Sequence, residues 1–254
     1  MLRRYWSYLL VPLTLAVVLA LWQFFVEAKN FPDFFLPTPT RIAERFIGAW
    51  ASGDLVKHGS ITLSESVAGF VIALLFSSVV GYAIAKSRLL ERIIAPYLVA
   101  SQTVPVIALA PLILVWLGTG FLSNVLVAAL VCFFPMLVNT VTGIRNVHFE
   151  YRRLMLSYAA TRGEIFFKLE LPAALPVFFA GARVGATLAV IGVTVIELFW
   201  GDRGLGFLLN RARGTFDTPL LFVALLSLSA IALALYGVIA LFEWLLVKRP
   251  RGLG

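Results

Sequence analysis

Six long apolar runs, separated by shorter polar segments, dominate the pattern of this sequence. The runs cover residues 9–25, 62–85, 93–116, 122–142, 174–200 and 219–247. A helix that spans a membrane needs about 20 mostly apolar residues, whereas a strand of a membrane barrel needs about ten with strict alternation. The runs are long and lack alternation, so they predict an all-α membrane protein with six transmembrane helices.

The composition agrees with a chain that is buried in lipid. Of the 254 residues, 61% are hydrophobic and 13% are charged, whereas a soluble domain has about 25% charged residues. We expect one transmembrane domain over residues 1–254. One cysteine, Cys132, and two distant histidines, His58 and His148, exclude an intrachain disulfide framework and offer no ligand cluster for a metal.

The basic residues cluster at the ends of the apolar runs, which indicates orientation in a membrane rather than binding to nucleic acid. With a cytoplasmic N-terminus, thirteen of the 21 Lys and Arg residues fall in cytoplasmic segments and seven in outer segments, with Arg183 inside a span. Because cytoplasmic loops carry the excess of positive charge, the pattern predicts that both termini are cytoplasmic.

Prolines interrupt the third run, and one of them, Pro105, follows the polar residues Ser101, Gln102 and Thr103. A proline inside a helix removes a backbone hydrogen bond and kinks or breaks the helix. In a membrane, such backbone is tolerated where it is buried in protein or lines a cavity. Two interpretations stay open: these four residues line a translocation path, or the kink serves helix packing alone.

Other polar side chains also lie within the runs. A charge in a membrane costs about 3 kcal/mol, so Glu197 is expected to face the pathway or a gate, to pair with Arg203 or Arg211, or to be exposed at the membrane interface. Asn139 is expected either to line the path or to join helices by a hydrogen bond.

Three further charged residues lie nearer the ends of the runs. Glu65 and Glu243 are expected at the head-group boundary. Arg183 is expected to snorkel or to pair with Glu170, although its position would also let it help an anionic substrate to leave.

Two loops contain predicted short helices. In the first outer loop, Ile42, Phe46, Ala49 and Trp50 share one face at helical spacing, with Thr40 as the expected N-cap. This amphipathic helix lies either on the membrane surface or against the protein. The long cytoplasmic loop, residues 145–172, predicts two short helices around a turn of small residues, which form either a docking protrusion or a solvated loop.

The cytoplasmic loop resembles the "EAA" coupling loop of binding-protein-dependent ABC importer permeases. That pattern is Glu-Ala-Ala, three residues, Gly, nine residues, Ile, one residue and Leu-Pro. Leu171 and Pro172 match, and Leu169 replaces the Ile. Ala159 stands where the pattern has Gly, although alanine resists a positive φ. Arg153 begins the segment in place of Glu-Ala-Ala.

Further segments resemble the same family, including Glu197 followed by Gly-Leu-Gly at residues 204–206. The resemblance covers about residues 30–247. It is nearest to the branch that moves nitrate, sulfonates, taurine, bicarbonate and pyrimidine or flavin-type vitamin precursors.

The resemblance implies a type I ABC importer permease in the bacterial inner membrane. Such a chain would work with a second copy or a homologue, cytoplasmic ATPase subunits, an extracytoplasmic substrate-binding protein and membrane lipid. The residues implied to contact the ATPase are Glu150, Arg153, Ala159, Ala160, Thr161, Arg162, Leu169, Leu171 and Pro172.

The chain lacks a Gly-x-x-x-x-Gly-Lys-Ser/Thr motif, so ATP and Mg are expected on the partner ATPase, and no cofactor or catalytic residue is expected here. The alternative is a secondary transporter or channel that works alone, but the six runs show no evident internal repeat. A membrane enzyme would need a catalytic set of side chains that we do not find in the sequence.

Overall fold

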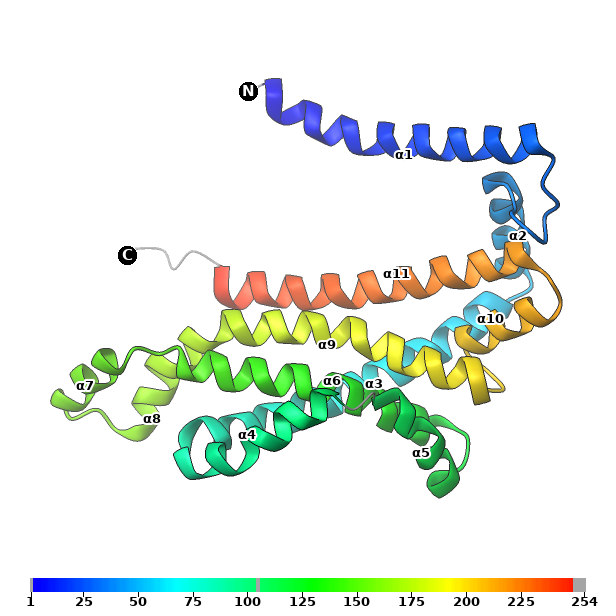
Figure 1. Cartoon of the computed structure of the whole chain (residues 1–254). Coiled ribbons are helices and arrows are strands. Elements are labelled where there is room, and N and C mark those ends of the chain that lie inside the picture. Colours follow the sequence, from blue (N-terminus) through cyan, green and yellow to red (C-terminus); the bar gives the residue numbers. More distant parts are fainter. Residues whose placement is uncertain (1, 104–105, 249–254) are drawn as a thin grey trace.

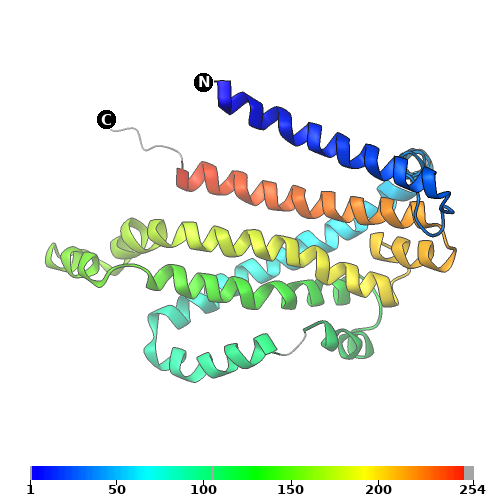
Figure 2. The ribbon, with the colours of Figure 1, turned by 45° about the horizontal axis from the view of Figure 1, so that its top comes forward.

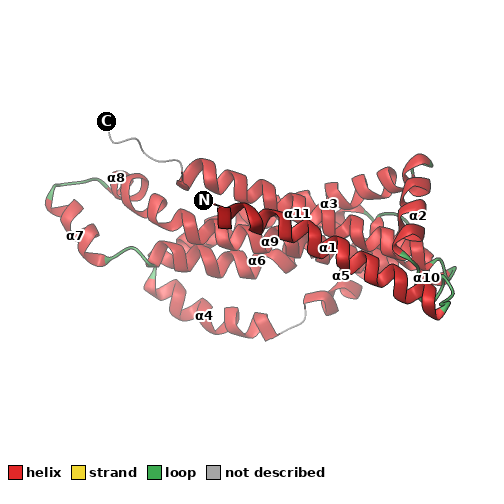
Figure 3. Cartoon of the chain, turned by 90° about the horizontal axis from the view of Figure 1, so that it is seen from above, coloured by secondary structure: helices red, strands yellow, loops and turns green. Residues whose placement is uncertain are grey.

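The computed structural model describes residues 2–103 and 106–248, and Pro105 lies outside this part. The described residues form helices joined by short loops, with no strand (Figure 3). The prediction of an all-α protein is therefore confirmed. The longer helices are α1 (Leu2–Lys29), α2 (Pro39–Ala51), α3 (Asp54–Lys86), α4 (Arg88–Thr103), α6 (Phe121–Arg145), α9 (Leu171–Trp200), α10 (Leu205–Gly214) and α11 (Thr218–Glu243). The shorter ones are η1 (Val106–Leu109), α5 (Ala110–Leu117), α7 (Phe149–Ser157), α8 (Arg162–Ile165), η2 (Phe166–Glu170) and η3 (Trp244–Lys248).

Helices α3, α6 and α9 form the core of the bundle, and α11 lies along α9 (Figures 1 and 2). Small residues set their spacing. A Cβ at Gly69 of α3 would lie 2.6 Å from the Cβ of Ala128. A Cβ at Gly192 of α9 would lie 3.0 Å from the Cα of the same alanine. Ala128 of α6 is thus enclosed on two sides, which is the small-residue packing typical of membrane helices.

Five helical segments of the described chain are long and apolar enough to cross a membrane. They are Pro12–Lys29, Asp54–Lys86, Phe121–Arg145, Arg162–Trp200 and Thr218–Val247. The predicted span at residues 93–116 is not one of them. Within it the structure describes α4 up to Thr103 and, from Val106, the 3-10 turn η1 followed by α5, with residues 104–105 outside the described part.

The two ends of the bundle differ in what they carry. The start of α1, the end of α11 and helices α7 and α8 lie at one end, which we call the protrusion end (Figure 1). Helices α2 and α10 lie at the other, which we call the α10 end. In both views the α4–α5 segment runs from the first end towards the second (Figures 1 and 2).

Helix α1 stands apart from the bundle. It lies near α2 at the α10 end and diverges from α11 towards the protrusion end (Figures 1 and 2). Only 6% of its apolar window is buried. Trp22 packs on Phe222 of α11 with ring centroids 5.5 Å apart, and Gln23 donates a hydrogen bond to Thr40 at 3.1 Å.

The amphipathic helix in the outer loop is α2, and it packs on the protein through part of its apolar face. Ile42 and Ala49 are buried in a cluster with α10 and α11, whereas Phe46 and Trp50 stay 40% and 59% exposed. The expected N-cap is wrong by two residues, because the hydroxyl of Thr38 accepts the hydrogen bond from the Arg41 N–H.

The charged residues near the ends of the runs are buried or paired within the protein. Glu65 and Glu243, which were expected at the head-group boundary, have 1% and 8% of their surface exposed. Arg183 pairs with Glu243 at 3.1 Å and lies over the ring of Tyr236. It does not pair with Glu170. The physical reason is that α9 and α11 lie side by side, which brings a cation and an anion of different spans together.

Candidate functional site

The turn between α7 and α8 is closed by backbone hydrogen bonds. The Ala159 N–H donates to Leu156 O at 2.9 Å, and the Ala160 N–H donates to Met155 O at 3.0 Å. This pair of bonds is the Schellman motif, in which the residue after the helix adopts a left-handed conformation. Ala159 is that residue, with φ 54°. The position where the EAA pattern has Gly therefore takes the conformation that glycine favours, despite the alanine.

Thr161 begins the next helix with a capping box. Its hydroxyl accepts from the Glu164 N–H at 3.3 Å, and the Glu164 carboxylate accepts from the Thr161 N–H at 3.0 Å. These two reciprocal bonds satisfy donors that a helix start leaves free. The turn and the cap together fix the angle between α7 and α8, although both helices are short.

The α7–α8 protrusion presents large apolar side chains to its surroundings. Helix α7 buries none of its residues. The exposed large side chains are Phe149 (65%), Tyr151 (57%), Leu154 (55%), Leu156 (56%), Tyr158 (81%) and Phe167 (67%). Large apolar side chains exposed together on one short segment favour a contact with a partner or a membrane.

The residues implied to contact an ATPase lie along this protrusion and the start of α9. Those that are exposed are Glu150, Arg153, Ala159, Thr161, Arg162 and Leu171, and those that are half-buried are Ala160, Leu169 and Pro172. The guanidinium of Arg153 lies over the ring of Phe149 at 4.7 Å. The exposed members are placed to meet a partner.

A buried polar cluster lies at the α10 end, around Glu197. The carboxylate is fully buried, and Thr62 of α3 donates to it at 2.8 Å. The Gly206 N–H, in the first turn of α10, donates to the other oxygen at 2.8 Å. The Thr62 hydroxyl in turn accepts from the Leu205 N–H at 2.8 Å. Glu197 thus joins α3, α9 and the start of α10, where a helix favours an anion.

Two more side chains of α3 extend this cluster. His58 accepts a hydrogen bond from the Gly204 N–H at its Nδ1 atom, at 3.0 Å. Glu65 accepts from the amide of Asn124 in α6 at 2.8 Å. The cluster therefore connects four helices through side chains that are each at most 6% exposed.

Glycines make room for the Glu197 carboxylate. A Cβ at Gly204, which has φ 91°, would overlap the Glu197 carboxylate. A Cβ at Gly206 would lie 2.5 Å from Thr194 O and 2.6 Å from the Glu197 Cβ. Glu197 and the Gly-Leu-Gly segment that follows it in the sequence are thus one packed unit.

The expected ion pair of Glu197 is not formed in the described structure. Arg203 pairs with its neighbour Asp202 at 2.9 Å. This hydrogen bond from the guanidinium lowers the pKa of the Asp202 carboxyl. Glu197 relies instead on a hydroxyl and a backbone N–H, both of which are uncharged donors.

The other pathway candidates are Asn139 and the residues around Pro105. Asn139 of α6 donates to Pro135 O of its own helix at 2.8 Å, and its Cβ would lie 2.5 Å from a Cβ at Gly181 of α9. It therefore lies where α6 and α9 pack closely. Ser101, Gln102 and Thr103 end α4, and their side chains, like Pro105, lie outside the described part of the structure.

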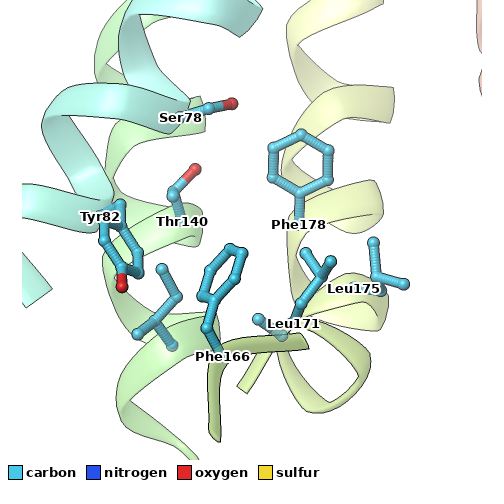
Figure 4. Close-up of a pocket in the computed structure, with 9 residues that line it drawn as sticks. Ser78, Tyr82, Thr140, Phe166, Leu171, Leu175 and Phe178 are labelled. Carbon is cyan, nitrogen blue, oxygen red and sulfur yellow. The ribbon is translucent and has the colours of Figure 1, made fainter. Parts of the chain in front are cut away.

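A cavity of about 200 Å³ lies at the protrusion end, between α3, α6, η2 and α9 (Figure 4). Tyr82, Phe166 and Phe178 contribute rings to its wall, and Ser78 and Thr140 contribute aliphatic hydroxyl groups. Tyr82 and Phe166 meet edge to face with centroids 5.1 Å apart. The wall is almost entirely apolar, so it offers few groups for recognition of a polar ligand.

The sequence analysis missed most partners of Glu197. His58, Thr62 and Glu65 are spaced four and three residues apart, which places them on one helix face. Polar residues that share a face at the start of an apolar run were the available signal. Their partners, the Leu205 N–H and Asn124, are distant in sequence and became evident only in the fold.

Comparison with known proteins places the chain among membrane transport proteins. Residues 73–249 match the family described as binding-protein-dependent transport system inner membrane component. The riboflavin transport system permease protein RibX of Chloroflexus aurantiacus is 46% identical over 243 residues, which is 96% of this chain and 91% of that protein.

Two other relatives are named for the transport of different compounds. The formylaminopyrimidine transport permease protein ThiX of Halalkalibacterium halodurans is 32% identical, over 91% of this chain and 92% of that protein. A putative aliphatic sulfonates transport permease protein, SsuC of Bacillus subtilis, is 29% identical, over 92% of this chain and 84% of that protein. The resemblance to this branch is confirmed. The chain is a multi-pass membrane protein that belongs to the family of inner membrane components of binding-protein-dependent transport systems.

Proposed function

We propose that the chain is the membrane-spanning permease subunit of an ATP-driven importer for a riboflavin-like vitamin or precursor. The observation that supports this substrate class is the 46% identity to the RibX permease over 96% of this chain. Identity to the sulfonate relative is 29%. A nitrate-like or sulfonate-like anion is the second candidate, because that relative is named for aliphatic sulfonates.

The proposed topology has six passages, with both termini and the α7–α8 protrusion in the cytoplasm of a bacterial cell. The five continuous spans account for five passages. The α4–α5 segment, which runs from one end of the bundle towards the other, would supply the sixth (Figure 2). With an even number of passages, the start of α1 and the end of α11 lie on the same side, as in Figure 1.

The proposed partners follow from exposed surfaces and from the family. Cytoplasmic ATPase subunits, which hold ATP and Mg, would contact the apolar side chains of the protrusion. A second permease copy or a homologue would cover α1, whose apolar window is 6% buried. An extracytoplasmic binding protein would deliver the substrate at the α10 end. The permease itself would have no catalytic activity.

Mechanistically, closure of the ATPases on ATP would draw two protrusions together and switch the paired bundles between inward-open and outward-open packings. Such a change is a rigid-body movement about an interface. The α10 end would move as one body, since the Glu197 cluster joins α3, α6, α9 and α10.

The first test is gentle purification of the tagged chain from its host, with mass spectrometry of the chains that purify with it. An ATPase chain in equal number and an extracytoplasmic binding protein are the expected companions. The recovered complex is then placed in liposomes with riboflavin, and uptake is measured with and without ATP. Taurine is the matched competitor for the anion candidate.

The outcomes separate the candidate functions. ATP-dependent riboflavin uptake that taurine does not reduce supports the proposal. Taurine uptake in its place would move the chain to the sulfonate group. Uptake by the purified chain alone, without ATP, would establish the stand-alone secondary transporter and overturn the importer.

A further inference from the structure

The strongest feature that the proposed function leaves unexplained is a buried carboxylate at the protrusion end. Glu170 is the last residue of η2, the π turn between α8 and α9, and it is fully buried. Turns of this type recur at functional sites. Neither the EAA pattern nor the pathway candidates include this residue.

Glu170 binds one cation from each of two helices. The Nζ atom of Lys86, the last residue of α3, lies 2.5 Å from its Oε1 atom. Arg152, from the middle of α7, forms an ion pair with the same oxygen. The second oxygen, Oε2, is buried and has no hydrogen-bond partner among the described residues. One oxygen atom therefore joins the protrusion to a membrane span.

The ion pair with Arg152 is important for α7, since none of the residues of that helix is buried. Besides the chain on either side, Arg152 connects α7 to a fully buried residue of the π turn. A shift of α7 would therefore act on Glu170 directly.

The link continues from Glu170 into the core. Lys86 lies 5.5 Å from the centroid of the Tyr82 ring, and Tyr82 meets Phe166 of the π turn. Both rings line the apolar cavity of about 200 Å³ (Figure 4). The cavity leaves space beside the π turn, so the turn can shift without displacing a packed core.

We propose that Glu170 is a positioning residue that transmits movement of the α7–α8 protrusion to α3, through the relay Arg152–Glu170–Lys86. The proposal rests on the importer function above. A structural staple alone would stabilise the fold and leave the ratio of transport to ATP hydrolysis unchanged. Loss of a relay would lower the ratio of transport to ATP hydrolysis. The reason is that the coupling free energy between the ATPase contact and the transport path can be lost while ATP hydrolysis itself continues.

The test uses the full complex in liposomes, with riboflavin and its binding protein. Glu170→Gln retains the shape of the side chain and removes the charge that attracts both cations. We expect ATP hydrolysis within about twofold of wild type and riboflavin transported per ATP reduced about 5- to 10-fold. Arg152→Met should lower the ratio similarly, and Arg152→Lys, which keeps the charge, should largely restore it.

A matched control is present at the same end of the bundle. Glu91 of α4 pairs with Arg145 of α6, an ion pair that does not include the protrusion. Glu91→Gln should leave the ratio of transport to hydrolysis at the wild-type value. The double variant of Arg152→Met and Glu170→Gln should be no worse than either single one, since both remove the same contact.

The outcomes are distinct. If wild type shows no ATP-driven uptake, the importer proposal itself is overturned, and the relay falls with it. If wild type is coupled and Glu170→Gln and Arg152→Met keep the ratio, the relay is overturned. Equal losses of transport and hydrolysis also overturn it, in favour of a staple. If Glu170→Gln does not assemble, Arg152→Met decides alone, because the Arg152 side chain is 38% exposed.

Discussion

At the α10 end, Glu197 accepts hydrogen bonds from Thr62 and the Gly206 N–H. At the protrusion end, Glu170 accepts from Lys86 and Arg152. Both carboxylates are fully buried. The first is surrounded by short uncharged donors that are themselves buried, whereas the second is bound by two long cations that are 33% and 38% exposed.

This difference predicts how each end of the bundle responds when a hydrogen bond or an ion pair is lost. Short side chains and backbone donors in close contact allow one arrangement, and any loss leaves a buried group unsatisfied. Long, partly solvated cations keep access to water, so they can exchange partners at lower cost. We therefore expect the α10 end to be stiff and the protrusion end to be adaptable.

The largest effect that tests this comparison is expected from Gly206→Ala. Its methyl group would lie 2.6 Å from the Glu197 Cβ and 2.5 Å from Thr194 O, so the start of α10 must move. We expect the free energy of unfolding to fall by about 3 kcal/mol. Denaturation in detergent, followed by tryptophan fluorescence, measures this change.

Gly214→Ala is the matched control for that variant. It lies at the end of the same helix, and a Cβ there would meet nothing within 4 Å. Its unfolding transition should stay close to that of wild type. Equal losses for both glycines would show that the Glu197 packing does not make the α10 end stiff.

The next effect is expected from Thr62→Val, which removes the hydroxyl between Glu197 and the Leu205 N–H. Two buried partners lose a hydrogen bond, so the free energy of unfolding should fall by about 2 kcal/mol. Thr187→Val in the half-buried part of α9 is the control, since the hydrogen bond of that hydroxyl is exposed and goes to Val184 O of its own helix. A control loss as large as that of Thr62→Val contradicts the prediction.

A smaller effect on stability is expected from Lys86→Met at the protrusion end. Arg152 still binds Glu170, and the Lys86 side chain is 33% exposed, so the loss should be below about 1 kcal/mol. The same unfolding assay applies. A loss that exceeds the one for Thr62→Val would reverse the comparison between the two ends.

The smallest effect is expected from Ala159→Gly in the turn of the protrusion. Glycine relieves the positive φ of 54° but adds freedom to the unfolded chain, so the net gain should be about 0.5 kcal/mol. Hydrogen exchange of the Ala160 amide, which donates to Met155 O, should slow slightly. Ala160→Gly is the control, and it should speed exchange at this turn.

Much of the fold could be predicted from the apolar runs, because a helix in lipid satisfies its own backbone and needs only length and hydrophobicity. The run at residues 93–116 shows where this reasoning ends. Its prolines predicted a kink or break, but the sequence could not show that a 3-10 turn at Val106–Leu109 precedes α5.

Contacts between neighbouring residues of the candidate site could be predicted from the sequence, whereas contacts between distant residues could not. Thr161 and Glu164 form a local capping box, and local hydrogen bonds can be anticipated from spacing. Glu170 and Lys86 are 84 positions apart, so only the packing of α3 against η2 could reveal their contact. The alternatives for Arg183 show the same limit, since its partner Glu243 is in another span.

Helix α1 has a consequence for the order of assembly during synthesis. It is synthesised before α11, yet its Trp22 packs on Phe222 of that helix. This contact can form only after α11 has been made. Docking of α1 is therefore completed late, and a chain truncated before α11 would leave Trp22 without this contact.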